Sequence, residues 1–157
     1  HDTVGLYSKL SNAFFDDKMK SSRSAFGLRM VTSKDSFVYF KEKHDIPRMT
    51  IFGADQSPTY SKSVYWTTFL NQETAVALGT ERFAKKYDMP VIYATINKEK
   101  RGHFSLDISI LCESPQHTKE GEITTLHTRK LEEQILAQPE YWLWTHKRWK
   151  RKRKENE

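Results

Sequence analysis

Two apolar runs joined by a short charged turn decide the fold class, and residues 91–112 have the sequence VIYATINKEKRGHFSLDISILC. The first run, Val91–Ile96, has the β-branched and aromatic composition of a buried strand. From His103 onward apolar and polar residues alternate, which is typical of a strand with one apolar face. The two runs predict a hairpin with a charged turn at Asn97–Gly102. The apolar face of its second strand is expected to lie in the core and holds Phe104, Leu106, Ile108, Ile110 and Cys112.

Strand-like and helix-like segments alternate along the rest of the chain. Asn12 is expected to cap a helix that runs to Phe26 and ends at Gly27. The alternation predicts an α/β fold with a central mixed β-sheet and flanking helices. The other expected elements are strands at 4–7, 28–32 and 49–52, a short helix capped by Ser33 or Asp35, a polar loop at 57–67, a helix at 72–87, a helix capped by Thr124, and a final helix that begins at Pro139.

Length and composition limit the class of protein. The chain has 157 residues, 37% of them hydrophobic and 13% aromatic, which excludes a disordered protein and supports one domain with its own core. The single cysteine, Cys112, excludes an internal disulfide and a cysteine-based metal cluster. No apolar stretch approaches the roughly 20 residues that span a bilayer, so we expect any membrane contact of this chain to be peripheral. Because a strand-like segment follows His1 almost at once, we also expect an N-terminal part to be missing.

Positive charge and tryptophan gather near the C-terminus. Residues 147–154 hold 7 of the 26 lysines and arginines, whereas residues 1–146 carry 19 basic and 18 acidic side chains. Three of the four tryptophans lie at positions 142, 144 and 149. This combination is typical of docking to an anionic surface such as phospholipid headgroups. The predicted membrane-contact residues are Trp144, Lys147, Arg148, Lys150, Arg151, Lys152, Arg153 and Lys154.

In the final predicted helix, Trp142 and Trp149 share one face, with His146 between them. The favoured interpretation is that both tryptophans pack on the body of the domain, because an indole carries a large apolar area. Trp144 and Arg148 are four residues apart, a spacing that permits a cation–π contact. A basic run that is simply solvated is the alternative interpretation.

Several segments, taken in order, resemble one family. Leu6–Asn12 with Asp16 and Arg23 resembles the second block of that family, and Gly53–Pro58, with an acidic–Gln pair after a strand, resembles its third. The tryptophan-rich segment from Leu131 to Lys150 resembles its ending. In this order and at these distances the blocks resemble the bacterial lipid A biosynthesis (late) acyltransferases, of the lysophospholipid acyltransferase-like class. The resemblance covers essentially the whole chain.

The resemblance implies a fold like that of glycerolipid acyltransferases and an O-acyltransferase activity. A fatty acyl group would move from acyl carrier protein, or acyl-CoA, to a hydroxyl of a lipid A precursor or related glycolipid during lipopolysaccharide synthesis in a Gram-negative bacterium. The location would be the cytoplasmic face of the inner membrane, with an N-terminal anchor in the full-length protein. No cofactor, metal or nucleic acid is expected. Residues 1–138 would be the C-terminal part of the acyltransferase α/β domain, and residues 139–157 a Trp-rich helix and basic tail.

The resemblance implies site residues at three positions. Arg23 and Asp55 are the candidate catalytic residues, and Arg23, Asp55 and Gln56 the candidate substrate-binding residues. The guanidinium of Arg23 would hold a phosphate of donor or acceptor, and Asp55 would anchor Arg23 or the acceptor. Each has a simpler interpretation, because Arg23 fits a solvated cation and Asp55 fits a turn before Pro58.

One departure from the family pattern matters for activity. The family's first block, His-x4-Asp or His-x4-Glu, supplies a general base with an orienting carboxylate, and it belongs upstream of His1. Two other His-x4-Glu spacings occur, His117 with Glu122 and His127 with Glu132. Five residues on a helix separate His127 and Glu132 by about 140°. We therefore expect neither pair to be catalytic and expect this chain alone to be inactive.

A second hypothesis is a non-catalytic module that binds membrane or nucleic acid through its basic tail. Polyanion binding by such a tail would weaken steeply with salt. The nearly neutral body offers no basic face in the sequence, which favours the first hypothesis. At the hairpin tip, Lys98, Lys100 and Arg101 suit at most the docking of acidic acyl carrier protein.

Overall fold

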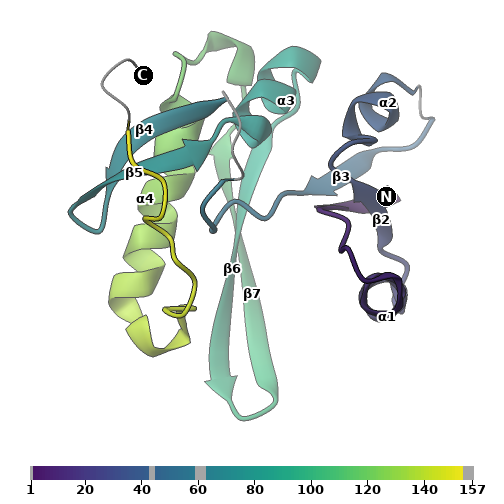
Figure 1. Cartoon of the computed structure of the whole chain (residues 1–157). Coiled ribbons are helices and arrows are strands. Elements are labelled where there is room, and N and C mark those ends of the chain that lie inside the picture. Colours follow the sequence, from purple (N-terminus) through teal and green to yellow (C-terminus); the bar gives the residue numbers. More distant parts are fainter. Residues whose placement is uncertain (1, 43–44, 59–62, 154–157) are drawn as a thin grey trace. The chain divides into compact units, whose positions relative to one another are not determined.

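The expected alternation of strands and helices is present in the computed structural model, which describes residues 2–42, 45–58 and 63–153 (Figure 1). The α/β class is thereby confirmed. The chain forms two units, residues 1–53 and residues 54–157, so the segment from Pro139 onward belongs to the second unit. Within the described residues the strands pair in three separate sheets, one parallel and two antiparallel.

The first unit is built on a three-stranded parallel sheet in the order β2-β1-β3. Its middle strand, β1, contains the strand expected at residues 4–7, and Val4 in it is fully buried. A helix follows each of the first two strands, as parallel pairing requires. The elements are β1 (Asp2–Tyr7), α1 (Ala13–Ser24), β2 (Arg29–Thr32), α2 (Ser36–Lys41) and β3 (Arg48–Ile51).

Helix α1 begins as predicted, ends at Ser24, two residues before the expected Phe26, and does not bury its apolar residues. The Asn12 side chain accepts a hydrogen bond from the Phe15 N–H at 3.2 Å, and Gly27 follows the helix with φ 90°. Phe15 is 61% exposed and Phe26 fully exposed. The buried residue is Asp16, which accepts the Leu10 N–H at 2.9 Å, a bond that lowers the pKa of its carboxyl. The helical period therefore predicted the helix correctly and its buried face wrongly.

The second unit contains two antiparallel hairpins and two α-helices among the described residues. In Figure 1, helix α4 runs beside the long hairpin β6–β7, whose turn extends below the helix. Gln134 joins them, because its Nε2 donates to the Ile96 carbonyl at 3.1 Å. The elements are β4 (Val64–Phe69), β5 (Gln72–Ala77), α3 (Gly79–Tyr87), β6 (Val91–Lys100), β7 (His103–Cys112), η1 (Pro115–His117), α4 (Glu122–Ala137) and η2 (Pro139–Tyr141).

The hairpin β4–β5 corrects two predictions. Residues 64–67 of the expected polar loop are strand, and the helix expected over 72–87 begins only at Gly79. The expected loop also includes residues 59–62, which lie outside the described part. Leu70 and Asn71 make the tight turn, with φ 47° and 61°. A leucine at positive φ is uncommon, so the two-residue turn was not evident from the sequence.

The hairpin β6–β7 has the predicted pairing but not the predicted burial. On the apolar face of β7, Phe104 is 63% exposed and Ile110 is 65% exposed. Leu106 and Ile108, which lie between them, are exposed to a similar degree. Cys112 is half-buried and packs against a small core of Ala84, Val91 and Ile123. Helix α4 packs on the opposite face, where the Tyr93 hydroxyl lies 3.4 Å from Gln134 Oε1. Alternation therefore identified two faces, and the tertiary packing selected the other one for burial.

Helix α4 begins in a different way from the one predicted. Thr124, the predicted cap, lies inside the helix. The residue before the helix is Gly121, with φ 81°. The fully buried carboxylate of Glu81, from α3, accepts the N–H groups of Gly121 and Thr124 at 2.7 and 3.0 Å. It also accepts the Thr124 hydroxyl at 2.7 Å. A side chain 40 residues away thus satisfies the free donors of the first turn, which local capping rules do not predict.

The prediction of a final helix that begins at Pro139 is wrong. One 3₁₀ turn, η2, follows α4, and residues 142–153 form turns and irregular backbone. Pro139 sits in the first turn of η2, where a proline is tolerated, but the N–H groups after it bond only to nearby carbonyls. The paths of Trp142 to Arg153 are therefore set by side-chain packing and not by helical period.

We expect Gly121→Ala to destabilise the protein much more than Gly102→Ala. Both glycines have positive φ, which costs about 1–2 kcal/mol for a residue with a Cβ. A Cβ on Gly121 would also overlap the Tyr65 ring, whereas one on Gly102 meets nothing within 4 Å. Overpacking of this kind costs about 1–3 kcal/mol more. Urea unfolding of the two variants measures the difference, and equal losses would contradict the close approach of Tyr65.

Candidate functional site

The C-terminal segment packs onto the hairpin β4–β5 through its tryptophans. Phe69, fully buried, lies with its ring centre 6.3 Å from that of Trp142 and 6.2 Å from that of Trp149. The Trp149 indole N–H donates to Thr74 Oγ1 at 2.9 Å. The prediction that Trp142 and Trp149 hold this segment on the body is confirmed, although the segment is not a helix.

Arg148 is buried, which corrects its prediction as a membrane contact. Its side chain donates from Nη1 to the Ala75 carbonyl at 2.9 Å, and the guanidinium carbon lies 5.5 Å from the centre of the Phe69 ring. Only 3% of the residue is exposed, so it does not reach a surface. The cation–π partner is Phe69 and not the predicted Trp144, whose indole N–H donates to the Pro139 carbonyl at 2.7 Å.

The guanidinium of Arg148 is a buried cation, and Asp55 is the acidic residue that acts on its pKa. Burial lowers the pKa of Arg148 to about 10, and the carboxylate of Asp55 opposes this shift. Arg148 therefore stays charged at neutral pH. Its Nε is buried without a hydrogen-bond partner. An unpaired buried charge is costly, so the field of Asp55 is part of what makes the burial tolerable.

The predicted site residue Asp55 lies in a half-buried turn close to the C-terminal segment. Two residues further on, the Ser57 N–H donates to His146 Nε2 at 2.9 Å. The Asp55 carboxylate also raises the pKa of Tyr93, after the larger effect of burial. The turn thus gathers Asp55, Tyr93, His146 and Arg148 in the second unit, whereas the side chain of Gln56 is exposed.

Arg23, the other predicted catalytic residue, lies in the first unit. It is exposed in the last turn of α1, where a cation is favourable next to the carboxyl end of the helix. An exposed guanidinium is available to an anionic ligand, and it also fits the simpler interpretation of a solvated cation.

Neither His-x4-Glu spacing forms an imidazole–carboxylate pair among the described residues. Glu132 accepts the Leu70 N–H at 2.5 Å and pairs with Arg129, and Glu122 accepts the Lys119 N–H at 2.9 Å. His117 is exposed. His127 is buried, and its Nε2 has no partner. The prediction that these pairs are accidental is consistent with these contacts.

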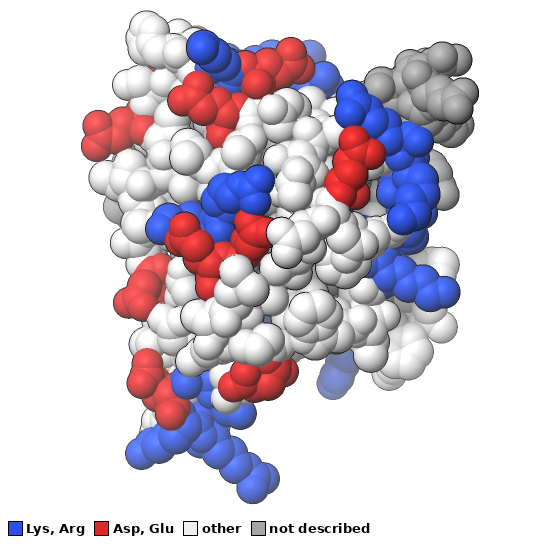
Figure 2. Space-filling model, turned by 90° about the vertical axis from the view of Figure 1, so that its left-hand side faces the viewer, with Lys and Arg blue, Asp and Glu red and all other residues white. Residues whose placement is uncertain are grey.

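The exposed part of the basic segment is smaller than predicted. Lys147, Lys150, Lys152 and Arg153 are exposed, and Arg153 pairs with Glu73 at 3.1 Å. Arg151 is half-buried, with its guanidinium 5.8 Å from the Trp66 ring centre. Lys154 lies outside the described residues. In Figure 2, basic side chains gather along the right-hand margin and at the lower end of the face, while both signs mix over its middle.

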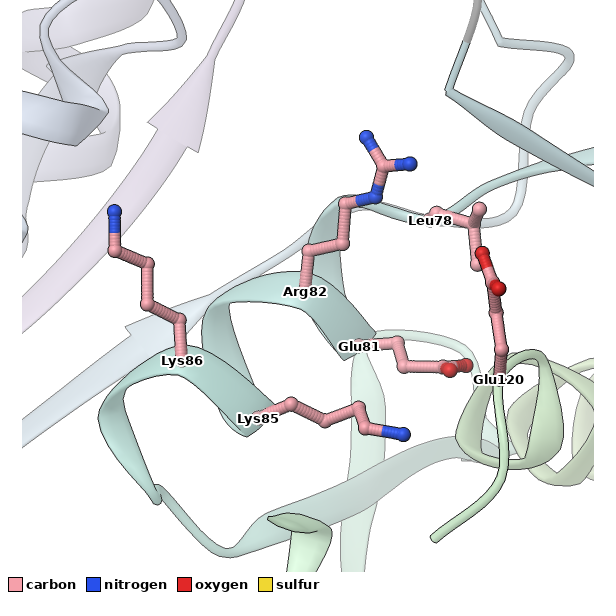
Figure 3. Close-up of a pocket in the computed structure, with 6 residues that line it drawn as sticks. All are labelled: Leu78, Glu81, Arg82, Lys85, Lys86 and Glu120. Atoms are coloured by element: carbon pink, nitrogen blue, oxygen red, sulfur yellow. The ribbon is translucent and has the colours of Figure 1, made fainter.

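A shallow hollow of about 430 Å³ on α3 holds none of the predicted site residues. Figure 3 shows Arg82, Lys85 and Lys86 extending from α3, with Glu81 pointing toward the start of α4. Lys85 donates to the Thr118 carbonyl at 2.5 Å, and Arg82 bonds to Ser63. Because Glu81 and these cations already have protein partners, the hollow does not resemble an anion site.

Among the described residues, no group of three His, Cys, Asp or Glu side chains is arranged to hold a metal ion. In the same part of the chain, no helix has the length and apolar character needed to cross a membrane. At the hairpin tip, Lys98 lies over the Tyr141 ring at 4.9 Å, and Lys100 and Arg101 are exposed.

Sequence reasoning missed the bond of His146 to the turn that carries Asp55 and the electrostatic effect of Asp55 on Tyr93. Both were visible in the sequence, His146 between two tryptophans and Tyr93 in a strand. No local pattern connects either one with a turn tens of residues away, so only a signal of paired variation could have found them.

Comparison with known protein families gives a match over most of the chain. The family described as bacterial lipid A biosynthesis acyltransferase matches residues 1–151. A comparison with curated proteins finds no match.

The free energy of unfolding should decrease as the pH is lowered from about 6.5 to 4, because of His127. Burial lowers the pKa of His127 to about 4 from its ordinary 6.5. Below pH 6.5 the unfolded chain therefore binds a proton that the folded chain does not, and the loss reaches about 3 kcal/mol near pH 4. In urea unfolding from pH 7 to 4.5, we expect His127→Gln to reduce the pH dependence and the exposed control His117→Gln to keep it. An unchanged slope in His127→Gln would contradict the burial of a neutral imidazole.

Proposed function

Because the chain belongs to the bacterial lipid A biosynthesis acyltransferase family, we propose that it is part of an O-acyltransferase acting on a lipid A precursor or related glycolipid. The acyl donor in this proposal is acyl carrier protein, with acyl-CoA as the alternative, and the place is the cytoplasmic face of the inner membrane. The family match over residues 1–151 is the observation that carries it.

In the reaction, the acceptor hydroxyl attacks the acyl thioester carbonyl, the C–O bond forms, the C–S bond breaks, and the thiol leaves. The hydroxyl proton must pass to a base in the same step. Arg23 would hold a phosphate group of donor or acceptor through its planar guanidinium. Asp55 would anchor the acceptor, with Gln56 beside it as a further polar contact.

The proton acceptor in this proposal is a His-x4-Asp or His-x4-Glu block outside residues 1–157. The contacts of the two histidines with this spacing support it. His127 is enclosed, with Glu132 bonded elsewhere, and His117 is not joined to Glu122. The chain of 157 residues would then bind its substrates without transferring the acyl group.

The exposed cations of the C-terminal segment support attachment to an anionic membrane. Each cation near such a surface contributes on the order of 1 kcal/mol. Trp144, more than half exposed, stands beside them and suits the headgroup level. Arg148 has no part in this contact, because it is buried.

A non-catalytic module that binds nucleic acid through the same cations is the second candidate. The observation in its favour is the exposed run Lys147, Lys150 and Lys152. The mixture of acidic and basic side chains over the middle of the face in Figure 2 does not extend this run into a groove. A gel shift with RNA and DNA at physiological salt tests it, and tight binding there would favour this candidate.

We expect no acyl transfer by the 157-residue chain and clear transfer by a form extended upstream to include the His-x4-Asp or His-x4-Glu block. In the extended form, Arg23→Ala should lower turnover at least tenfold, because phosphate positioning is lost. Lys18→Ala, an exposed cation on the same helix, is the matched control and should keep the wild-type rate. Transfer of labelled acyl groups from acyl carrier protein to a lipid A precursor is the measurement. Robust transfer by the short chain would refute the external base, and a wild-type rate in Arg23→Ala would remove Arg23 from the site.

We expect Lys147, Lys150 and Lys152, changed together to Gln, to weaken binding to anionic vesicles at least tenfold. Substitution is preferred to deletion, because Arg148 and Trp149 hold the segment on β5. The control changes Lys9, Lys18 and Lys34, three exposed lysines of the first unit, to Gln and removes the same charge. Co-sedimentation with phosphatidylglycerol-containing vesicles compares them, and equal loss in both would show that net charge and not this segment governs attachment.

A further inference from the structure

A hydrogen bond from a backbone N–H to a histidine side chain joins the turn that carries Asp55 to the C-terminal segment. The Ser57 N–H donates to His146 Nε2 at 2.9 Å, across 89 residues of sequence. Since Nε2 is the acceptor, the imidazole proton lies on Nδ1. The bond is partly buried, so it competes little with water.

The turn has few other means of fixing its shape. Residues 52–58 contain no strand and no helix, so the backbone of Asp55 and Gln56 lacks ladder hydrogen bonds. The Ser57 hydroxyl oxygen is buried without a partner. A contact with a rigid neighbour is therefore needed to hold one conformation of the turn.

The neighbour is rigid because two residues after His146 are anchored. Arg148 donates to the Ala75 carbonyl at 2.9 Å, and the Trp149 indole donates to Thr74 Oγ1 at 2.9 Å. Two short backbone hydrogen bonds fold the segment around His146. The His146 N–H donates to the Leu143 carbonyl at 3.0 Å, and the His146 carbonyl accepts the Arg148 N–H at 2.8 Å. The position of the imidazole thus follows from the packing on β5.

Arg148 also acts on the turn through its charge. It is a buried cation within the electrostatic range of Asp55. A cation held in a poorly solvated place exerts a stronger field than an exposed one. The same segment therefore fixes the backbone of the turn and places a buried cation within electrostatic range of its carboxylate.

We propose that His146 and Arg148 are positioning residues of the acyltransferase, which hold the Asp55–Pro58 turn in its working conformation. The proposal rests on the proposed function for the role of Asp55. His146 acts through the Ser57 N–H, and Arg148 acts by anchoring the segment and by its charge. Neither touches substrate.

The contact itself is tested first, by NMR on the ¹⁵N-labelled 157-residue chain. We expect His146→Ala to speed hydrogen exchange of the Ser57 amide at least tenfold, while the amides of α4 keep their rates. His146→Gln should restore exchange to within about threefold of wild type, because its side-chain oxygen can accept the same N–H. The wild-type imidazole should show the Nδ1–H tautomer. Unchanged Ser57 exchange in His146→Ala, or the Nε2–H tautomer in wild type, overturns the proposal.

The consequence for the reaction is tested in the form extended upstream. We expect His146→Ala to lower kcat at least tenfold with KM changed less than threefold, His146→Gln to recover most of kcat, and Arg148→Lys to lower kcat as well. His103→Ala, an exposed histidine of β7, is the control and should have no effect. A wild-type kcat in His146→Ala, despite faster Ser57 exchange, would overturn the positioning role and leave the proposed function intact. Absence of transfer by the wild-type extended form would instead refute the proposed function, and the role in catalysis would fall with it.

Discussion

The packing of Phe69 between Trp142 and Trp149 is the interaction on which the second unit depends. It buries a large apolar area at the end of strand β4 and holds a segment that has almost no regular backbone structure of its own. Once the two indoles are in place, Arg148 is enclosed between the hairpin β4–β5 and the segment, and its guanidinium meets the Phe69 ring and the Ala75 carbonyl. The position of His146 beside the Asp55 turn follows from this arrangement.

The second unit also buries polar groups in an unequal way. Glu81 is fully paired, since its two oxygens accept three hydrogen bonds at the start of α4. His127 and Arg148 are each buried with one nitrogen unpartnered. A satisfied buried carboxylate stabilises a fold, whereas an unsatisfied buried donor or acceptor costs about 1–3 kcal/mol. Such a cost at Arg148, close to a residue that the family resemblance implicates in catalysis, is more typical of a functional site than of a structural core.

The cations of the C-terminal segment therefore fall into two groups, buried and exposed, which a count of charges does not separate. Arg148 belongs to the interior, and Arg151 lies half-buried against Trp66. Lys147, Lys150 and Lys152 point to solvent and retain the character expected of a membrane-binding surface. The backbone of the segment is irregular, so its buried and exposed cations do not alternate with a helical period.

The sequence alone determined the α/β class, the strand–helix order of the first unit, the long hairpin β6–β7, the Asn12 cap and the family. These features depend on contacts between near neighbours or on motif order, which the chain carries locally. Only the tertiary structure decided which face of β6–β7 is buried, that residues 64–77 pair as a hairpin around Leu70 and Asn71, and that the segment after η2 is not helical. It alone brought His146 and Arg148 to the Asp55 turn and Glu81 to the start of α4. Apart from the local turn at Leu70 and Asn71, the deciding partner lies dozens of residues away, and a packing contact of that kind overrides the local preference of the backbone.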